Sequence, residues 1–498
     1  MRKFLNFCLF VGILLTDPPT WGSGSSSSTT TESIAVERIL QDIQELSHPK
    51  YHGRQAGTES GWKSAQYLVS RFRSLGLVPV RRFGEHKQNG TWFQQRPHTA
   101  IQLGDPAVVT LSPLDSNPSS MPRSLIPGQD FLPVLDSPSA KLTAPTVFVG
   151  YGIVDPARGV DDYRGIDANN RMVLFLRGKP SSYPRWVTHE EKAAIAQERG
   201  AVGYLTVTGP LVDRYEARKG LGSIPLAIYA ASHDVRPIPG AWIHGKVLDQ
   251  LLQATQGSLQ ALQQAANDTH TFQSMPLPIL THLHWESRFL PGTLTNVIGM
   301  LPGRDPKLRD EIILVGAHRD HFGKQAGLDF PGADDNASGT AVMLELAKKL
   351  SESARLPRRT ILFVSFDGEE RGLLGSTVYV SDPALPLGET VAMVNLDHLG
   401  VGNGNLTVGI TRLDTTLVQQ VANQATLGDK VKIYGFFPGG DHVPFYEAGV
   451  PTITIVSSGS HPHFHQSSDT FESVQPETLS TAAHFLYSLM TRLADPSH

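Results

Sequence analysis

The chain has 498 residues, 40% hydrophobic content and a formal net charge of -4, with 43 Lys and Arg against 47 Asp and Glu. This length and composition predict a globular protein with a sizeable core and more than one domain. Because the charges nearly balance and neither sign forms a long run, nucleic acid is excluded as an expected partner.

The first residues have the pattern of a secretory signal peptide. Met1-Arg2-Lys3 is followed by an apolar run over 4–15 and then by small residues around 22–24. The run is shorter than the roughly 20 apolar residues that a spanning helix needs, so we expect cleavage near residue 22 and no stable membrane insertion. The only cysteine, Cys8, lies in this run. The mature chain would then have no disulfide and no thiolate ligand, which suits a secreted or periplasmic protein.

The part of the chain that follows predicts a linker, two helices and a domain junction. Ser, Thr and Gly fill residues 23–31, a composition typical of a flexible linker. Apolar residues then recur at helical spacing over 34–46 and 61–77. A Pro- and Ser-rich stretch at 111–139 changes the composition and predicts a junction between domains.

A small α/β unit is predicted beyond this junction. The patterns predict strands at 146–149, 172–176 and 201–207, helices at 192–198 and 241–266, and an alternating strand at 278–285. The last helix and the last strand lead out of the unit.

The last third alternates strands with helices. We predict strands at 312–315, 360–366, 391–396 and 452–456, and helices at 340–350, 375–380 and 476–492. This alternation predicts an α/β fold with a mostly parallel mixed sheet sandwiched by helices. Ligands of such sheets bind at the carboxyl ends of the strands, so the polar residues there are candidates for a site.

Histidines and acids follow four of these strands directly. The strand ends lead into residues 316–321, 367–370, 397–398 and 461–469. Before the helix at 340–350, a turn bounded by Gly332 and Gly339 adds Asp334 and Asp335. Imidazole nitrogen and carboxylate oxygen are ligands that zinc accepts, and two ions about 3.5 to 4 Å apart need a bridging carboxylate. We therefore expect one of the two Asp residues to bridge two metal ions.

The tandem acids Glu369 and Glu370 can divide the remaining work. One would bind metal, while the other would accept a proton from water and pass it to the leaving amine. A single acid or histidine at a strand end is usually a cap or a solvated residue, but the joint placement of five makes that reading improbable: His318, Asp335, Glu370, Asp397 and His465. Asp320 is interpreted as the carboxylate that orients His318. Support, capping or exposed positions are expected for the other histidines: His321, His398, His461 and His463.

These motifs resemble the dizinc aminopeptidase family that includes bacterial leucyl-type aminopeptidases and, more distantly, glutamate carboxypeptidase. The segments that carry the resemblance are 316–321, 332–339, 367–376, 395–397, 440–445 and 465–470. The resemblance implies a zinc exopeptidase fold and assigns each ligand a role: His318 and Asp397 on one zinc, Glu370 and His465 on the other, Asp335 as the bridge, and Glu369 as the general base.

Two details of the resemblance bear on single positions. The family's bridging acid stands directly before Asn, which implies Asp335 rather than Asp334. Its last histidine stands four positions before an Asp, which matches His465 with Asp469. One position departs from the family: some members have Tyr before this histidine as an oxyanion donor, and here it is Phe464, which has no donor.

The resemblance extends to the earlier chain and implies its domains. Residues 146–207 are similar to a protease-associated domain, and 34–77 to the family's N-terminal cap. We therefore expect a signal peptide at 1–22, a linker at 23–31, the N-terminal part of the peptidase domain at 32–110, the inserted protease-associated domain with its linkers at 111–290, and the catalytic zinc peptidase domain at 291–498.

The expected function is that of an exported aminopeptidase that carries two Zn²⁺ ions and hydrolyses the N-terminal bond of peptides. Three alternatives stay open. A carboxypeptidase or dipeptidase could use the same dizinc centre, because the motifs do not fix which end of the substrate docks. Glutaminyl cyclase has a similar fold with a single zinc. An inactive peptide-binding protein would be expected to have lost ligands, and none is missing here.

Overall fold

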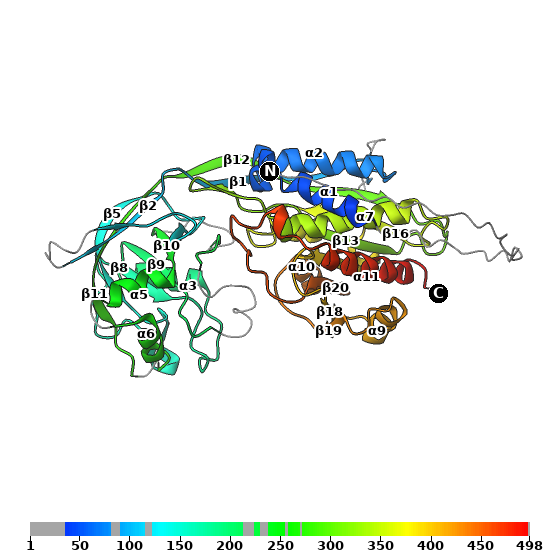
Figure 1. Ribbon diagram of the computed structural model, residues 1–498. Coiled ribbons are helices and arrows are strands. Elements are labelled where there is room, and N and C mark those ends of the chain that lie inside the picture. The colour runs from blue at the N-terminus through cyan, green and yellow to red at the C-terminus, as the bar shows by residue number, and fades with distance from the viewer. Residues whose placement is uncertain are drawn as a thin grey trace, which may run out of the picture. The chain divides into compact units, whose positions relative to one another are not determined.

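The computed structural model describes residues 35–80, 90–114, 122–212, 224–229, 238–253, 257–268 and 271–496 (Figure 1). The predicted signal peptide and linker lie outside these residues. Within them, no helix combines the length and the apolar character that crossing a membrane would need.

The first of two eight-stranded sheets carries the polar strand ends predicted from the sequence. Its strand order is β1-β12-β16-β13-β17-β20-β18-β19. The strands are β1 (Phe93–Leu103), β12 (Ser287–Leu301), β13 (Ile312–His318), β16 (Thr360–Phe366), β17 (Thr390–Asp397), β18 (Leu406–Thr411), β19 (Val431–Tyr434) and β20 (Thr452–Ser457). The four central strands β16, β13, β17 and β20 are parallel, whereas β12 and β18 pair with them in antiparallel fashion.

Helices cover both faces of this sheet and bury its central strands on both sides. The helices are α1 (Val36–Leu46), α2 (Glu59–Ser74), α7 (Gly339–Ser351), α8 (Leu374–Ser381), α9 (Thr415–Gln424), α10 (His442–Glu447) and α11 (Pro476–Ala494). On β13, Ile313 and Val315 join the core under α1, α2, α7, α9 and α11. Ile312 and Leu314 of the same strand join the core under α8 and α10. The predicted α/β sandwich is therefore confirmed.

The second sheet has the order β3-β2-β11-β5-β8-β9-β10-β4. Its strands are β2 (Val108–Pro113), β3 (Arg123–Ser124), β4 (Phe131–Pro133), β5 (Ala140–Phe148), β8 (Met172–Leu176), β9 (Gly203–Val207), β10 (Gly240–Ile243) and β11 (Met275–Trp285). The helix α3 (His189–Glu198) packs on one face, and α5 (Gly245–Gln253) and α6 (Leu259–Ala266) pack on the other. We call this second sheet, with its helices and the residues between β1 and β12, the second unit. The chain enters it after β1 and returns through β12. These two strands pair with each other over eleven residues, from Phe93↔Val297 to Leu103↔Ser287.

The smaller elements complete the description. Two hairpins are formed by β6 (Val154–Asp155) with β7 (Val160–Asp161) and by β14 (Gly323–Gln325) with β15 (Leu328–Phe330). Short helical turns are η1 (Pro49–Arg54), η2 (Pro156–Arg158), η3 (Ala333–Ser338), η4 (Leu387–Glu389) and η5 (Phe471–Ser473).

Two sequence predictions in the second unit need correction. The helix predicted at 241–266 is wrong at its start, because residues 240–243 form the buried strand β10, which pairs with β9. A short apolar run fits a buried strand as well as a helix, and periodicity cannot separate the two. The helical part is split, because α6 begins anew at Ser258, whose side chain accepts a hydrogen bond from the Ala261 amide. The stretch at 111–139 is also more than a junction, since β3 and β4 belong to the sheet.

Candidate metal centre

The carboxyl ends of the parallel strands bring the predicted site residues together. β13 ends on His318 and β17 ends on Asp397. The turn after β16 carries Glu369 and Glu370, and the loop after β20 carries His465. Since parallel neighbours end at the same edge of a sheet, side chains from separate stretches of sequence meet there.

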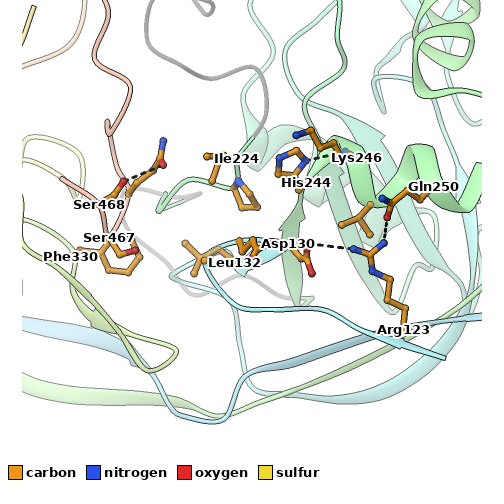
Figure 2. A pocket seen from close by; sticks show the side chains of 15 residues that line it. Arg123, Asp130, Leu132, Ile224, His244, Lys246, Gln250, Phe330, Ser467 and Ser468 are labelled. Carbon is orange, nitrogen blue, oxygen red and sulfur yellow. Dashed lines mark hydrogen bonds and ion pairs between the residues drawn. The ribbon is translucent and has the colours of Figure 1, made fainter. Parts of the chain in front are cut away.

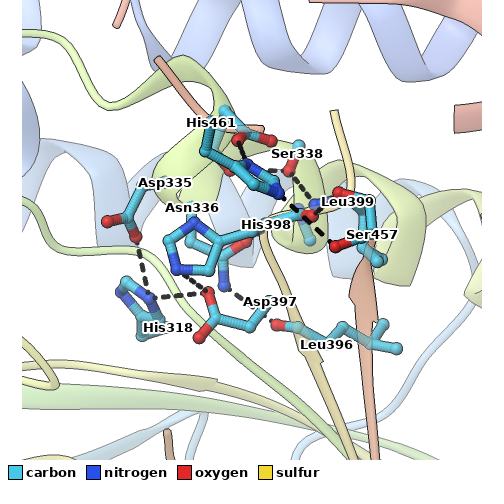
Figure 3. Close-up of polar contacts among 12 residues, drawn as sticks. His318, Asp335, Asn336, Ser338, Leu396, Asp397, His398, Leu399, Ser457 and His461 are labelled. Carbon is cyan, nitrogen blue, oxygen red and sulfur yellow. Dashed lines mark hydrogen bonds and ion pairs between the residues drawn. The ribbon is translucent and has the colours of Figure 1, made fainter. Parts of the chain in front are cut away.

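Asp335 lies between two of these histidines. Its Oδ1 is 3.3 Å from Nε2 of His318, and its Oδ2 is 3.2 Å from Nε2 of His465. The same His318 nitrogen is 3.3 Å from Oδ1 of Asp397, and the same His465 nitrogen is 3.4 Å from Oε2 of Glu370. Figure 3 shows the His318 side of this arrangement, where Asp335 and Asp397 converge on one imidazole nitrogen. Asp335 thus joins a His318–Asp397 pair to a His465–Glu370 pair.

These four separations fit ligands of a metal better than hydrogen bonds. An N–H···O bond usually measures about 2.7 to 3.2 Å, so all four lie at or beyond its upper end. Two ligands held about 2.0 to 2.2 Å from one tetrahedral zinc ion would lie roughly 3.3 to 3.6 Å apart. The measured values of 3.2 to 3.4 Å correspond to the edges of such tetrahedra. The donors and their spacing therefore fit zinc.

The electrostatics of the cluster are compatible with a bound cation. Burial raises the pKa of Glu369 and of Glu370 well above the ordinary range, and neighbouring carboxylates add to the effect. Burial opposes ionisation of Asp335 too, but the imidazoles around it hold its pKa well below the usual range. Burial likewise disfavours the imidazolium of His318, yet the surrounding carboxylates outweigh this and raise its pKa well above the usual value. A cation bound at the cluster would offset the cost of ionising these buried carboxylates.

The turn that carries Asp335 is held by the backbone and by Asp469. The Asp469 carboxylate accepts hydrogen bonds from the amides of Asp334, at 2.9 Å, and Asp335, at 3.0 Å. Asn336 accepts from the Gly339 amide and donates to the Leu396 carbonyl, so it ties the start of α7 to β17. The peptide bond between Asp335 and Asn336 is cis.

Asp334, the neighbour of Asp335, turns away from the cluster. Its Oδ1 accepts hydrogen bonds from the Gly400 and Val401 amides, and its Oδ2 lies 2.6 Å from Nδ1 of His461. The other His461 nitrogen faces the Ser457 carbonyl at 3.4 Å. Asp334, His398 and His461 also lie close enough to hold an ion. However, Asp334 and His461 already satisfy each other and the surrounding backbone, so a metal there is not required.

The tandem acids at the end of β16 are anchored in a matching way. The Asp320 carboxylate accepts hydrogen bonds from the amides of Glu369, at 3.1 Å, and Glu370, at 3.4 Å. His318 Nδ1 lies 3.1 Å from the Asp320 main-chain carbonyl and 3.7 Å from its carboxylate. The Asp320 carbonyl thus contacts His318 directly, and its carboxylate also holds the Glu369–Glu370 backbone. The role of the Asp320 carboxylate in orienting His318, from which it lies 3.7 Å away, stays a prediction.

The side chains of the two glutamates have different surroundings. Glu370 Oε1 lies 2.6 Å from Nδ1 of His321, which leaves Oε2 to face His465. Glu369 lies with His318 and Asp397, and ligand atoms of the three lie within 4.8 Å of one another, close enough to hold one metal ion. Among the described residues, no donor forms a hydrogen bond with the Glu369 carboxylate.

His321 is the residue whose importance the sequence understated. It is only 1% exposed and fixes Glu370 through the contact just described. In the sequence, its position three residues after His318 could have indicated that it lies beside the other site residues. Of the other histidines, His398 lies 3.6 Å from Asp397, and His463 contacts the Ser468 hydroxyl at the surface.

The loop around His465 also contacts the second unit. The Ala227 amide donates a hydrogen bond to the His465 carbonyl at 2.9 Å. The Phe464 ring stacks on the His465 imidazole, with centroids 3.7 Å apart, and packs beside Leu226 and Trp242. The position that carries Tyr in some members of the family is thus occupied by an apolar contact between the two units.

A pocket of about 510 Å³ opens beside this loop (Figure 2). Its walls come from the second unit and from Phe330 and residues 466–468. Arg123 in its wall contacts Gln250 and lies 3.6 Å from Asp130. The pocket is therefore lined in part by polar residues, and its arginine is already paired with an acid and an amide of the wall.

Comparisons with known proteins show what this chain is similar to. Residues 296–490 match Peptidase family M28. Probable glutamate carboxypeptidase VP8 of Zea mays is 25% identical over 448 residues, which cover 84% of this chain and 60% of that protein. Aminopeptidase YwaD of Bacillus subtilis is 32% identical over 208 residues, 39% of this chain and 43% of that protein. The chain thus spans less than two thirds of the length of these two relatives.

A solved structure shares the fold. The zinc aminopeptidase BSAP from Bacillus subtilis superimposes with a TM-score of 0.62 at 23% identity, covering 93% of this chain and 96% of that one. The predicted fold class is confirmed, and so is the resemblance to a family of aminopeptidases and glutamate carboxypeptidases. The family match begins at residue 296, so the assignment of the inserted unit as a protease-associated domain stays a prediction.

Proposed function

We propose, from the membership of residues 296–490 in peptidase family M28, that the protein is a zinc-dependent aminopeptidase with two Zn²⁺ ions bridged by Asp335. His318 and Asp397 would hold one ion, and His465 and Glu370 the other. The observation that carries the proposal is the set of four ligand separations of 3.2 to 3.4 Å that meet at Asp335. These separations match the spacing expected around two neighbouring zinc ions.

The free carboxylate of Glu369 supports the assignment of a general base. When bound, the two zinc ions would supply Lewis-acid activation of a water molecule and of the scissile carbonyl. Glu369 takes the proton from that water and delivers it to the departing amine, which its place beside His318 and Asp397 allows. Asp320 keeps Glu369 in position by holding its backbone amide.

A carboxypeptidase or dipeptidase on the same centre is the second candidate, and the maize relative, a probable glutamate carboxypeptidase, favours keeping it. Peptides blocked at one end separate the two. An aminopeptidase hydrolyses an aminoacyl-anilide and a C-terminally amidated peptide but not an N-acetylated one. A carboxypeptidase has the opposite requirement. Cleavage of the N-acetylated peptide alone would replace the aminopeptidase proposal by its rival.

Metal analysis tests the dizinc assignment directly. We expect two zinc ions per chain after dialysis, loss of hydrolysis on chelation, and recovery when zinc is returned. One zinc per chain would favour the cyclase reading over the dizinc one. We also propose, from the pattern at residues 1–22, that the protein is exported; its recovery with the leader intact in the cytoplasmic fraction would contradict this.

A further inference from the structure

Arg371, the residue after the two glutamates, is a buried arginine to which no described residue offers a hydrogen-bond acceptor. Its side chain is only 8% exposed. Its Nε and Nη1 are buried, and neither forms a hydrogen bond. Within the part of the chain that the structure describes, no ion pair involves this residue. A guanidinium carries five donors and stays charged, so an unmatched one in a buried place is costly.

Another buried arginine shows how the chain satisfies such a group when it serves the fold. Arg54 is fully buried, and its guanidinium donates four hydrogen bonds to main-chain carbonyls, those of Arg319, Leu46, Pro331 and Gly332. Arg371 has no such cage. Its guanidinium instead lies over an aromatic ring, with its central carbon 4.5 Å from the centroid of Tyr229.

Tyr229 connects Arg371 to the metal centre. It belongs to the second unit, and its ring lies 5.7 Å from Phe322, which in turn lies 4.7 Å from the His465 imidazole. The Tyr229 hydroxyl accepts a hydrogen bond from Gln55 at 3.0 Å, so its own proton remains available to an acceptor. When an aromatic ring stacks on the face of a guanidinium, the N–H donors at the edge of the guanidinium remain available to a ligand.

His98 adds another polar atom without a partner on this side of the sheet. Its Nε2 is buried and forms no hydrogen bond with a described residue. Burial lowers the pKa of His98 to about 4, and the charge of Arg371 contributes. His98 is therefore neutral, and Arg371 is the cation of this group.

We propose that Arg371, stacked on Tyr229, binds a carboxylate of the substrate beside the metal centre. The inference rests on the proposed function and narrows its substrates to peptides with an anionic group near the scissile bond. A carboxylate fits because its two oxygens match the donor fork of a guanidinium, and a charged ligand offsets the cost of the buried cation. Its source is either the free C-terminal carboxylate of a short peptide or an acidic side chain next to the cleaved bond.

Three substrates test the proposal on the zinc-loaded enzyme: Ala-Ala, Ala-Ala-amide and Ala-Glu-amide. The first has a terminal carboxylate, the third has only a side-chain carboxylate, and the second has neither. We expect kcat/KM for one of the two carboxylate substrates to exceed that for Ala-Ala-amide by about 10- to 100-fold. The substrate that gains identifies the source of the carboxylate.

Substitution of the arginine tests its role. In Arg371→Met, the ratio of kcat/KM for carboxylate and amide substrates should fall to within about threefold of one, and in Arg371→Lys it should be intermediate. Arg412→Met is the matched control, because Arg412 also lies over a tyrosine ring, Tyr446, at 4.4 Å but bonds to the Tyr446 carbonyl at the surface. That control should keep the wild-type ratio.

Each outcome decides the question. A wild-type ratio near one, or an unchanged ratio in Arg371→Met, overturns the proposal. If Arg371→Met does not fold, as judged by circular dichroism, the ratio in Arg371→Lys decides: a fall supports the carboxylate site, and a wild-type value overturns it. Failure of the wild type to hydrolyse either Ala-Ala-amide or an alanyl-anilide would count against the proposed aminopeptidase instead.

Discussion

The two tandem acid pairs of the site, Asp334-Asp335 and Glu369-Glu370, are built alike and used differently. Each pair has its two backbone amides held by the carboxylate of a separate aspartate, Asp469 for the first and Asp320 for the second. In each pair the second acid faces His465. The shared part of the arrangement thus fixes the acid that faces His465.

The difference lies in the first acid of each pair. Asp334 uses its oxygens on two backbone amides and on His461, whereas the Glu369 carboxylate has no hydrogen-bond donor among the described residues. A buried acid that the fold satisfies serves structure, and one left unsatisfied beside a metal centre is available for chemistry. The sequence alone would not distinguish Asp334 from Glu369, since each is the first of two consecutive acids.

Replacing the bridge should have the largest effect. Asp335→Ala removes the one carboxylate that both pairs share, so we expect bound zinc to fall below two per chain and kcat/KM to fall by at least about 1,000-fold. Inductively coupled plasma analysis and an aminoacyl-anilide assay measure the two quantities. A variant that keeps both ions would show that Asp335 does not bridge them.

Replacing the free acid should separate metal binding from turnover. Glu369→Gln keeps the shape of the side chain but cannot accept the proton, so we expect full zinc content and a fall in kcat of about 100- to 1,000-fold. Glu370→Gln is the matched variant from the same pair, and it should lose metal. Equal zinc loss in both variants would remove the distinction between the two glutamates.

Replacing the satisfied acid should affect stability before chemistry. Asp334→Ala leaves two buried amides and His461 without their acceptor, so the free energy of unfolding should fall by about 3 to 5 kcal/mol. The zinc content and kcat of the folded fraction should stay near the wild-type values. Urea unfolding measures the first quantity. A large loss of kcat with unchanged stability would place Asp334 in the reaction rather than in the fold.

Much of the fold was readable because the last third alternates buried strands with amphipathic helices. The strands β1 and β12 were missed, since they pair with each other and expose many side chains, and so lack a clear apolar rhythm. β10 was mistaken for helix because a four-residue buried strand has no period of its own.

Some features of the site could likewise be predicted from the sequence, and others could not. Strand ends predicted that these histidines and acids would gather at one edge of the sheet, and Asp335 does lie between His318 and His465. Its role as the bridge, chosen over Asp334 from the motif resemblance, stays a prediction. The partners of main-chain amides could not be predicted, because tertiary packing decides that Asp469 and Asp320 reach them. The unpartnered state of Arg371 is likewise visible only in three dimensions.

Asp162, a buried acid of the second unit, extends the comparison with Asp334. Its replacement should have the smallest effect on the free energy of unfolding, and that effect should depend most on pH. Asp162 is anchored by two backbone amides, those of Tyr151 and Ile153, but no imidazole among the described residues pairs with it as His461 pairs with Asp334. Burial raises the pKa of Asp162 to about 6 from an ordinary 3.8. Its ionisation therefore costs nothing below pH 3.8, and the cost grows until the pH passes 6.

Asp162→Asn removes this charge and keeps an oxygen for the two amides. The free energy of unfolding of the variant, relative to the wild type, should rise by about 2 to 3 kcal/mol between pH 4 and pH 7. Urea titrations of both proteins, with chelator present so that zinc loss at low pH does not enter, measure the difference. A difference that does not change with pH would mean that the two backbone amides alone offset the cost of ionising the buried Asp162 carboxylate.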